Sequence, residues 1–320
     1  MSAGRAMGLL LGVAADTALG DPRRWHPVSA FGRMAQAAER AGYRDNRLVG
    51  AGYAVVLTSL PIAGGLAVER LTRHSPVGQA VSTALATWVA LGGASLAAEG
   101  TAMGRELDAG ELDAARDRLP NLCGRDPNAL DNRGLARASV ESVAENTSDA
   151  VVGPLFWGAV AGVPGVLGYR AVNTLDAMVG HRSPRYLRFG WAAARLDDLV
   201  NLLPARLSAA LTVSAAPVVG GSARGAWDAW RRDAAAHPSP NAGQVEAAFA
   251  GALSVRLGGR TNYRHGVEDR PVLGDGRNPD SGHVTRAVEL SRVVGALAGG
   301  VAVAIAGTRA LFRARRRRAR

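Results

Sequence analysis

Long runs without charge dominate the hydrophobic pattern of this chain. Residues 48–68 and 77–98 contain no charged side chain. Each run approaches the roughly 20 apolar residues that a helix needs to cross a bilayer. Two further windows, 199–221 and 293–307, are apolar except for one arginine inside the first. The pattern therefore predicts several membrane-spanning helices.

A soluble helical protein with buried apolar helices is the alternative, and the mean hydropathy of +0.02 favours it. Soluble helices, however, usually carry a polar stripe with a period of 3.6 residues, and the two charge-free runs lack one. A weaker window at 150–167 is broken by Gly and Pro, which is tolerated where a helix lines a protein cavity. We expect an all-α fold, a polytopic membrane helical bundle with polar extramembrane loops, in one domain of residues 1–320.

Two polar segments complete this organisation. Residues 224–282 form a long polar stretch with Pro- and Gly-rich turn signals, which predicts an extramembrane loop or subdomain. The basic C-terminal tail 313–320 directly follows an apolar stretch, where the positive-inside rule places a cytoplasmic anchor. Asp16 interrupts the first apolar run, so we expect this segment to be retained rather than cleaved as a signal peptide. The expected location is the cell (cytoplasmic) membrane, with a multi-pass topology.

The formal charge of +11 comes entirely from arginine, because the chain contains no lysine. Together with many Ala and Gly residues, this usage is typical of a GC-rich genome, so the charge is weak evidence for a nucleic-acid partner. No aromatic residues alternate with the terminal arginines to stack on bases. We expect no nucleic acid to bind. The single cysteine, Cys123, excludes an intramolecular disulfide and a multi-cysteine metal site.

Acidic residues recur at helical spacing in the middle of the chain. Glu141, Glu145 and Asp149 stand four residues apart and would share one face of a helix. Three like charges so close together repel one another. The spacing therefore favours a face that binds a cation, either Mg²⁺ or an amine, over an acidic face that only meets water.

A second acidic group begins the window 199–221. Asp197 and Asp198 lie within one helical turn of Asn201, and the three offer the hard oxygen ligands that Mg²⁺ accepts beside substrate phosphates. Arg195 and Arg206 bracket them. Ionisable groups at membrane depth are costly, so a functional role is the default interpretation.

Further candidate residues accompany these acids. Asn173 and Asp176 would lie one turn apart beside Arg170. His26 follows two arginines that could bind phosphate, although a loop at the membrane edge explains most of that segment. For each single candidate, a polar network that joins helices is the alternative.

Several common motifs are missing from the sequence. There is no Gly-x₄-Gly-Lys-Ser/Thr phosphate loop, and a chain without lysine supplies neither that residue nor a Schiff base. A nucleotide would have to bind through arginine, Mg²⁺ and backbone amides. Without a His-Glu-x-x-His zinc site or a Gly-x-Ser-x-Gly nucleophile elbow, hydrolase functions lose support.

Taken together, these segments resemble the CbiB/CobD family of cobalamin biosynthesis, the adenosylcobinamide-phosphate synthases. The resemblance covers nearly the whole chain and consists of separate motifs in the right order. They are Gly20-Asp21-Pro22, His26-Pro27-Val28, Gly124-Arg125-Asp126, Glu141-Ser142-Val143-Ala144-Glu145-Asn146, Tyr169-Arg170, Asn173-Thr174-Leu175-Asp176, Asp197-Asp198, Asn201 and Ser239-Pro240-Asn241. The arginine tail and the last apolar run match none of them.

The resemblance implies a polytopic membrane enzyme that joins adenosylcobyric acid to (R)-1-amino-2-propanol, or to its O-phosphate. The product would be adenosylcobinamide or its phosphate, which makes the enzyme a carbon–nitrogen ligase. The implied cofactors are ATP and Mg²⁺, the corrinoid is the substrate, membrane lipid surrounds the chain, and a homo-oligomer is left open. Activation of a carboxylate by ATP requires Mg²⁺ and arginine to spread negative charge, and attack by the amine requires a carboxylate that takes up a proton.

Residue type and spacing then give each candidate a role. We assign Mg²⁺ to Asp197, Asp198 and Asn201; phosphate or corrinoid carboxylates to Arg170, Arg195, Arg206, Asn173 and His26; and the amine and its proton to Glu141, Glu145 and Asp176. These side chains are expected to converge in one pocket at the membrane border. The alternatives are a membrane phosphotransferase that acts on a lipid alcohol, and a non-catalytic transporter or scaffold. Transport predicts inverted repeats, and the sequence shows none.

Overall fold

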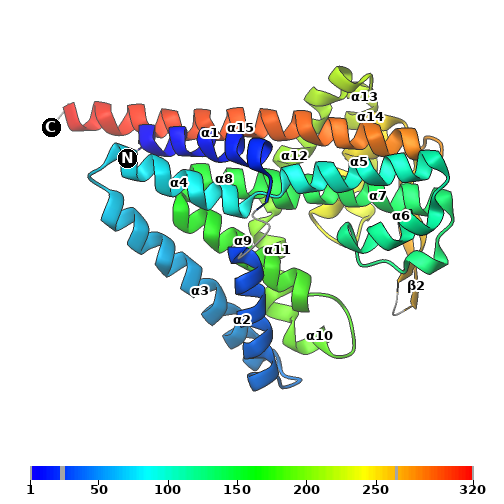
Figure 1. Ribbon diagram of the computed structural model, residues 1–320, viewed down its shortest axis with the longest axis horizontal. Helices are drawn as coiled ribbons and strands as arrows, with labels where there is room; N and C mark the ends of the chain where they lie inside the picture. Colours follow the sequence, from blue (N-terminus) through cyan, green and yellow to red (C-terminus); the bar gives the residue numbers. More distant parts are fainter. Residues whose placement is uncertain (1, 22–25, 264–265, 319–320) are drawn as a thin grey trace. The chain divides into compact units, whose positions relative to one another are not determined.

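The computed structural model describes residues 2–21, 26–263 and 266–318, and these are almost entirely helical (Figure 1). Within this part of the chain, the exception is an antiparallel hairpin of β1 (Leu257–Tyr263) and β2 (Gly266–Leu273). The all-α prediction is confirmed. The chain forms two compact units: Met1–Gly92, Gly153–Asn201 and Ala298–Arg320 make the first, and Gly93–Val152 with Leu202–Leu297 makes the second.

The helices of the first unit are α1 (Ser2–Leu19), α2 (Pro27–Gly42), α3 (Arg47–Thr72), α4 (Pro76–Ala90), α8 (Gly153–Ala161), α9 (Val163–Val179), α10 (Tyr186–Phe189) and α11 (Trp191–Val200), with the last part of α15 (Ser281–Arg318). The second unit contains α5 (Gly93–Ala109), α6 (Leu112–Arg118), α7 (Asn132–Thr147), α12 (Leu202–Ala215), α13 (Ala223–Asp233), α14 (Ala242–Leu253) and the first part of α15. Short turns join them: η1 (Leu119–Asn121), η2 (Pro127–Ala129), the π turn η3 (Ser148–Val152), η4 (Ala216–Val219) and η5 (Ala234–Ala236).

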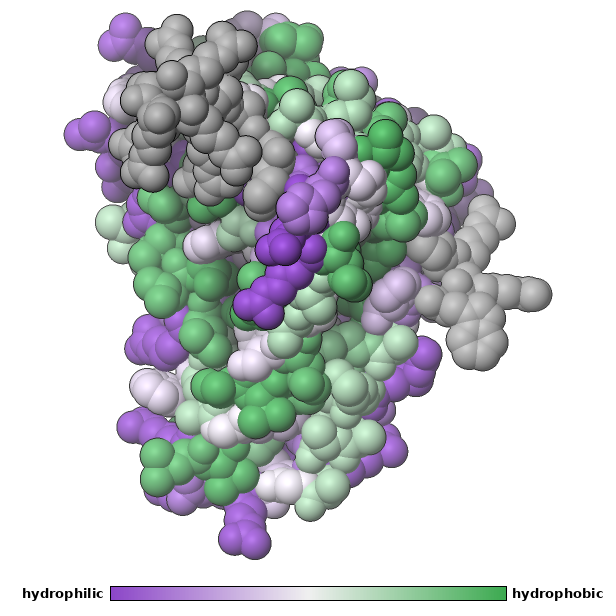
Figure 2. All heavy atoms as spheres, turned by 90° about the vertical axis from the view of Figure 1, so that its left-hand side faces the viewer, coloured by the Kyte–Doolittle hydropathy of each residue, from purple (hydrophilic) through white to green (hydrophobic). Residues whose placement is uncertain are grey.

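Four helical segments of the described chain are long and apolar enough to cross a membrane: Arg47–Thr72, Pro76–Ala109, Leu202–Val219 and Ser281–Thr308. They coincide with the four predicted windows, so the charge-free runs identified these segments correctly. Large apolar side chains stay exposed on them, including Leu60, Leu66 and Leu85. Figure 2 shows hydrophobic residues over much of the face that it draws. Lipid would satisfy such a surface, and the helices fit a membrane protein.

A glycine face joins α1 to α4. Gly4, Gly8 and Gly12 recur every fourth residue, and a Cβ added at Gly8 would lie 2.5 Å from the Cβ of Thr83. Small residues at this spacing let two helix backbones approach closely, as is common between membrane helices. The C-terminal part of α15 also lies along α1, where a Cβ on Gly299 would come 3.6 Å from a methyl group of Val13 (Figure 1).

An apolar core holds α9 and α11 in place in the first unit. Leu175 and Val179 of α9 are buried with Phe189 and Ala193, and the aromatic rings of Tyr43 and Tyr53 pack on Phe189. The polar residues of α9 and α11 therefore start from fixed backbone positions.

The predicted loop at 224–282 folds as α13, α14 and the hairpin. Helix α14 is mostly buried. The hairpin is fastened to α7 by Arg137, which donates hydrogen bonds to the carbonyl oxygens of Gly258 and Arg260. Gly258 has a φ of +78°, and a Cβ there would lie 2.0 Å from the Pro271 oxygen, so only glycine fits. Helix α15 runs on to Arg318, but the side chains of the predicted tail 313–320 lie outside the described residues.

Candidate functional site

Six ionisable side chains gather in the second unit, and we call them the charged cluster. Its members are Arg125, Glu141, Glu145, His237, Glu246 and Arg270. They come from the loop before η2, from α7, from the turn after η5, from α14 and from β2. Arg125, Glu141, His237 and Glu246 are only 5%, 3%, 7% and 2% exposed. Buried charges of this kind persist only when they are paired, so each must be stabilised by the others.

Glu141 is held on both carboxylate oxygens. Oε2 accepts a hydrogen bond from Arg125, and Oε1 accepts one from the Gly258 amide at 2.6 Å. Helix α7 supplies the carboxylate, and the register shift at the start of β1 brings the Gly258 amide to it. Glu141 therefore serves as a fixed counter-charge for Arg125 and as an anchor for the hairpin.

Glu145 lies one turn further along α7 and has a different environment. Its side chain is accessible to solvent, unlike that of Glu141. Desolvation by the surrounding protein raises its pKa, while Arg270 and Arg125 counteract that rise. A carboxylate with a raised pKa is a stronger base and still reaches a solvent-borne substrate, which suits proton transfer.

Glu246 lies deeper, within the apolar helix α14. Burial raises its pKa well above the ordinary value, and the negative charges of Glu141 and Glu145 raise it further. The cluster contains three carboxylates but only two guanidinium groups, so holding a proton on Glu246 balances the charge. Two carboxyl groups, those of Glu145 and Glu246, thus bind protons more tightly than usual.

His237 closes the cluster from the turn that leads to α14. The amide of Ser239 donates to Nδ1 at 3.0 Å and orients the ring. Nε2 lies 3.8 Å from Glu246 Oε1 and 3.5 Å from an Arg270 nitrogen. Desolvation and the charge of Arg270 lower the pKa of His237. The imidazole therefore holds a proton less tightly than an ordinary histidine does.

A second group of polar side chains, the polar network, lies between α9 and α11 in the first unit. The Tyr169 hydroxyl donates to Asn201 Oδ1 at 2.8 Å, and Asn201 Nδ2 donates to Asp197 Oδ2 at 3.0 Å. Asn173 Nδ2 lies 3.5 Å from Asp197 Oδ1 and its oxygen accepts a bond from Arg170 at 3.2 Å. The side-chain amides of Asn173 and Asn201 thus orient the Asp197 carboxylate and the Arg170 guanidinium.

The other candidates surround this network less closely. Asp198 pairs with Arg195 at 3.1 Å on a more exposed side of α11. Asp176 lies half-buried on α9, with its carboxylate beside Gly180. His26 caps α2 by accepting from the Val28 amide at 3.2 Å.

The charges around His26 place it near the polar network. Burial lowers its pKa, Asp21 raises it and Arg170 lowers it, so His26 lies close enough to both to feel their charges. Residues 22–25, which precede it in the sequence, lie outside the described part of the chain.

The predicted site residues thus belong to two groups. Glu141 and Glu145 lie in the second unit, as does Arg206, which is exposed and bonds the carbonyl of Leu202. All the other candidates lie in the first unit. That the two groups meet in one pocket stays a prediction.

The polar network offers part of a Mg²⁺ site and would leave the remaining ligands to substrate and water. Among the described residues, no group of three or more His, Cys, Asp or Glu side chains could hold a metal ion. Mg²⁺ commonly binds one or two carboxylates and takes its other ligands from substrate phosphates and water. Asp197 with the amides of Asn173 and Asn201 provides such a partial set. The Tyr169 hydroxyl already occupies the Asn201 oxygen, so Asp197 would be the principal ligand of a metal ion held here.

Sequence reasoning gave no role to Arg125, Tyr169, His237, Glu246 or Arg270. Arg125 and Tyr169 belong to motifs of the family resemblance but were not assigned to the chemistry. Glu246 had a local signal, because it is the only charged residue among the apolar residues of α14. Arg270 and His237 offered none, since folding alone brings them to α7.

The chain combines helices long enough to cross a membrane with buried, paired acids and arginines. These features define a class of helical membrane protein whose interior holds charged groups. The chain belongs to the CobD/CbiB family of cobalamin biosynthesis, whose family pattern, described as CobD/Cbib protein, matches residues 9–291.

Relatives support this membership along most of the chain. It is 58% identical over 300 residues to the cobalamin biosynthesis protein CobD of Mycobacterium tuberculosis H37Rv, covering 93% of this chain and 95% of the relative. The CobD protein of Chromobacterium violaceum is 42% identical over 294 residues, with 89% and 91% covered. That of Rhodobacter capsulatus is 43% identical over 280 residues, with 85% and 87% covered. No solved structure matches the chain.

Proposed function

We propose that this chain forms the amide bond between adenosylcobyric acid and (R)-1-amino-2-propanol or its O-phosphate, giving adenosylcobinamide or its phosphate, with ATP and Mg²⁺. The observation that carries the proposal is the family match over residues 9–291. The two groups of charged side chains support it, because the reaction must bind anions and move a proton. A multi-pass location in the cell membrane is part of the same proposal.

The polar network would bind the phosphate-bearing side of the reaction. Mg²⁺ and ATP, when bound, activate the corrinoid carboxyl group for attack. Asp197 would hold the metal ion, and the Tyr169–Asn201 pair fixes the orientation of its carboxylate. Arg170, directed by Asn173, would stabilise the negative charge that develops on phosphate oxygens.

The charged cluster would bind the amine. Glu145 is exposed and has a raised pKa, so it accepts the proton that the nitrogen loses as the carbon–nitrogen bond forms. Glu141 has both oxygens engaged, and its role is to position Arg125 and the hairpin.

A reconstituted assay tests the proposed reaction. The purified full chain is incubated in detergent with adenosylcobyric acid, ATP, Mg²⁺ and either amino alcohol, and the corrinoid product is identified by mass. A product that gains the mass of the amino alcohol less one water supports the ligase. Phosphorylated lipid without an amide would instead support the phosphotransferase alternative.

Genetics gives an independent test. A strain without this chain should accumulate cobyric acid and grow with supplied cobinamide. Growth with supplied cobyric acid alone would place the chain at an earlier step and contradict the proposal.

Asp197→Asn provides the residue-level prediction. Loss of the charged ligand should lower turnover by about 100-fold or more, since it removes charge stabilisation from the activated state. Asp113→Asn, at an acid that is 99% exposed, serves as the matched control and should keep wild-type turnover. Normal turnover of the Asp197 variant would exclude this residue from the site.

A further inference from the structure

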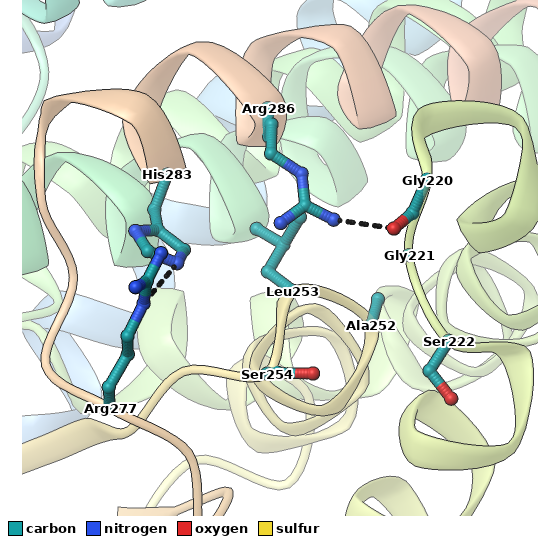
Figure 3. Close-up of a pocket in the computed structure, with 9 residues that line it drawn as sticks. All are labelled: Gly220, Gly221, Ser222, Ala252, Leu253, Ser254, Arg277, His283 and Arg286. Atoms are coloured by element: carbon teal, nitrogen blue, oxygen red, sulfur yellow. Dashed lines mark hydrogen bonds between the residues drawn. The ribbon is translucent and has the colours of Figure 1, made fainter.

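A basic pocket of about 460 Å³ lies in the second unit, and none of the residues that line it is a candidate site residue. Figure 3 shows it between α15, the end of α14 and the loop before α13. It is lined by Gly220, Gly221, Ser222, Ala252, Leu253, Ser254, Arg277, His283 and Arg286. None of these nine described residues is acidic, and the volume suits a small polar ligand or a lipid headgroup.

Two arginines supply the charge of the basic pocket. Arg286 extends from the second turn of α15 and donates to the Gly220 carbonyl oxygen at 3.0 Å (Figure 3). Arg277 lies beside His283 and donates from Nε to the imidazole Nε2 at 3.3 Å. Each guanidinium group is thus oriented by a hydrogen bond from one of its nitrogens.

His283 and Asp280 fix the direction of Arg277. Because Nε2 accepts from Arg277, the imidazole proton lies on Nδ1, which contacts Asp280. Asp280 also lies 3.8 Å from an Arg277 nitrogen and offsets part of its charge. With Arg286 added, the pocket keeps a net positive charge.

The loop before α13 strengthens the attraction for an anion. Ser222 is the N-cap of this 11-residue helix, and the N-terminal end of a helix favours negative charge. A Cβ at Gly221 would lie 2.5 Å from the Ala252 carbonyl oxygen, so glycine is needed for the loop to close against α14.

The basic pocket lies at the end of one membrane-length helix. The candidate span Leu202–Val219 ends directly before Gly220, whereas α15 begins at Ser281 and its uncharged run starts only at residue 293. Apolar helices end where the phosphate-rich headgroup region of a bilayer begins, and basic pockets at that level bind lipid headgroups. A ligand can reach this depth from the lipid or from water.

We propose that the basic pocket binds a phosphate group, carried either by an anionic phospholipid or by a water-soluble phosphate monoester. Guanidinium groups bind phosphate through two parallel hydrogen bonds, which Arg277 and Arg286 can both supply within the same pocket. The proposal does not rest on the amide-forming reaction, since it concerns a separate set of residues.

The test uses the full chain in phosphatidylcholine nanodiscs. One arm adds phosphatidic acid to the lipid and measures how much of it stays bound to the protein by native mass spectrometry. The other arm titrates O-phosphoethanolamine from solution, with ethanolamine as the ligand control. Arg277→Gln and Arg286→Gln should each weaken binding about tenfold or more. Arg133→Gln, at an exposed arginine of α7, should bind as the wild type does.

The two arms separate the sources of phosphate. If the arginine variants lose binding of phosphatidic acid alone, the pocket is a headgroup site. If they lose binding of O-phosphoethanolamine alone, it is a site for soluble monoesters. If the wild type binds neither ligand, or if both arginine variants bind as tightly as the wild type, the proposal is overturned. Should a Gln variant melt well below the wild type, Arg286→Lys keeps the positive charge but cannot make the paired hydrogen bonds. It should then bind more weakly than the wild type and more tightly than Arg286→Ala.

Discussion

Replacing Glu141 with Gln would remove a negative charge from a side chain that is 3% exposed and bonded on both oxygens. The amide oxygen of glutamine can still accept the hydrogen bond from Gly258. Its NH₂ group, however, would face the Arg125 guanidinium, where two donors meet. The variant therefore breaks the ion pair and leaves the hairpin bond in place.

The size of the effect follows from burial. Removing one partner of a buried ion pair costs about 3–5 kcal/mol, because the other charge stays in a poorly hydrated place. Glu145 and Glu246 also lie close enough to Arg125 to interact with its charge, so we expect about 3 kcal/mol, the low end of that range. At about 2–4 °C per kcal/mol, the melting temperature should fall by roughly 6–12 °C.

The assay is thermal unfolding of the full chain in detergent, followed by size-exclusion fluorescence after heating. Arg125→Gln should give a loss of similar size. The double variant Arg125→Gln/Glu141→Gln places two amides opposite each other and leaves neither side of this pair charged. Its loss of melting temperature should therefore be well below the sum of the two single losses.

Two results would refute this reasoning. A Glu141→Gln variant that melts within about 2 °C of the wild type would mean that the pair carries little free energy of unfolding. Additive losses in the double variant would mean that Arg125 and Glu141 stabilise the protein independently.

Two further predictions follow from the same contacts. Tyr169→Phe removes the hydroxyl that orients Asn201, so it should lower the free energy of unfolding by about 1–3 kcal/mol. It should also raise the Mg²⁺ concentration needed for half-maximal turnover, and an unchanged Mg²⁺ dependence would contradict that role. Because burial and neighbouring carboxylates raise the pKa of Glu246, the folded protein binds this proton more tightly than the unfolded chain, and stability falls as the pH rises above the ordinary carboxyl pKa. The melting temperature of Glu246→Gln should therefore gain on the wild type between pH 5 and pH 8, and a difference that stays constant or shrinks would contradict the raised pKa.

Most of the helical framework was predictable from the sequence, because a charge-free run is a local property. The predicted window 48–68 lies within the helix Arg47–Thr72, and 77–98 lies within Pro76–Ala109. The β1–β2 hairpin was not predicted, since Leu257–Tyr263 contains two glycines and no regular alternation of apolar and polar residues. Its strands are fixed by tertiary bonds from α7 instead.

The candidate site was predictable only where its residues are neighbours in sequence. The spacing of Glu141 and Glu145 correctly placed both on α7, and that of Asp197 and Asn201 placed both at one end of α11. Asp149 leaves the expected face because it falls in the π turn Ser148–Val152, which shifts the register of the helix. The partners Glu246 and Arg270 could not be predicted, because they lie more than a hundred residues from Glu141 in the sequence.

The bond between Glu141 and the Gly258 amide joins residues that are 117 positions apart, and this separation sets an order of assembly. At about 5–20 residues per second, a ribosome needs on the order of ten seconds after making Glu141 to deliver the amide that completes its coordination. Throughout that interval Arg125 is already available to pair with Glu141, but the hairpin and the carboxyl group of Glu246 have not yet been made. Helix α7 therefore reaches its final environment only after β1 has been synthesised.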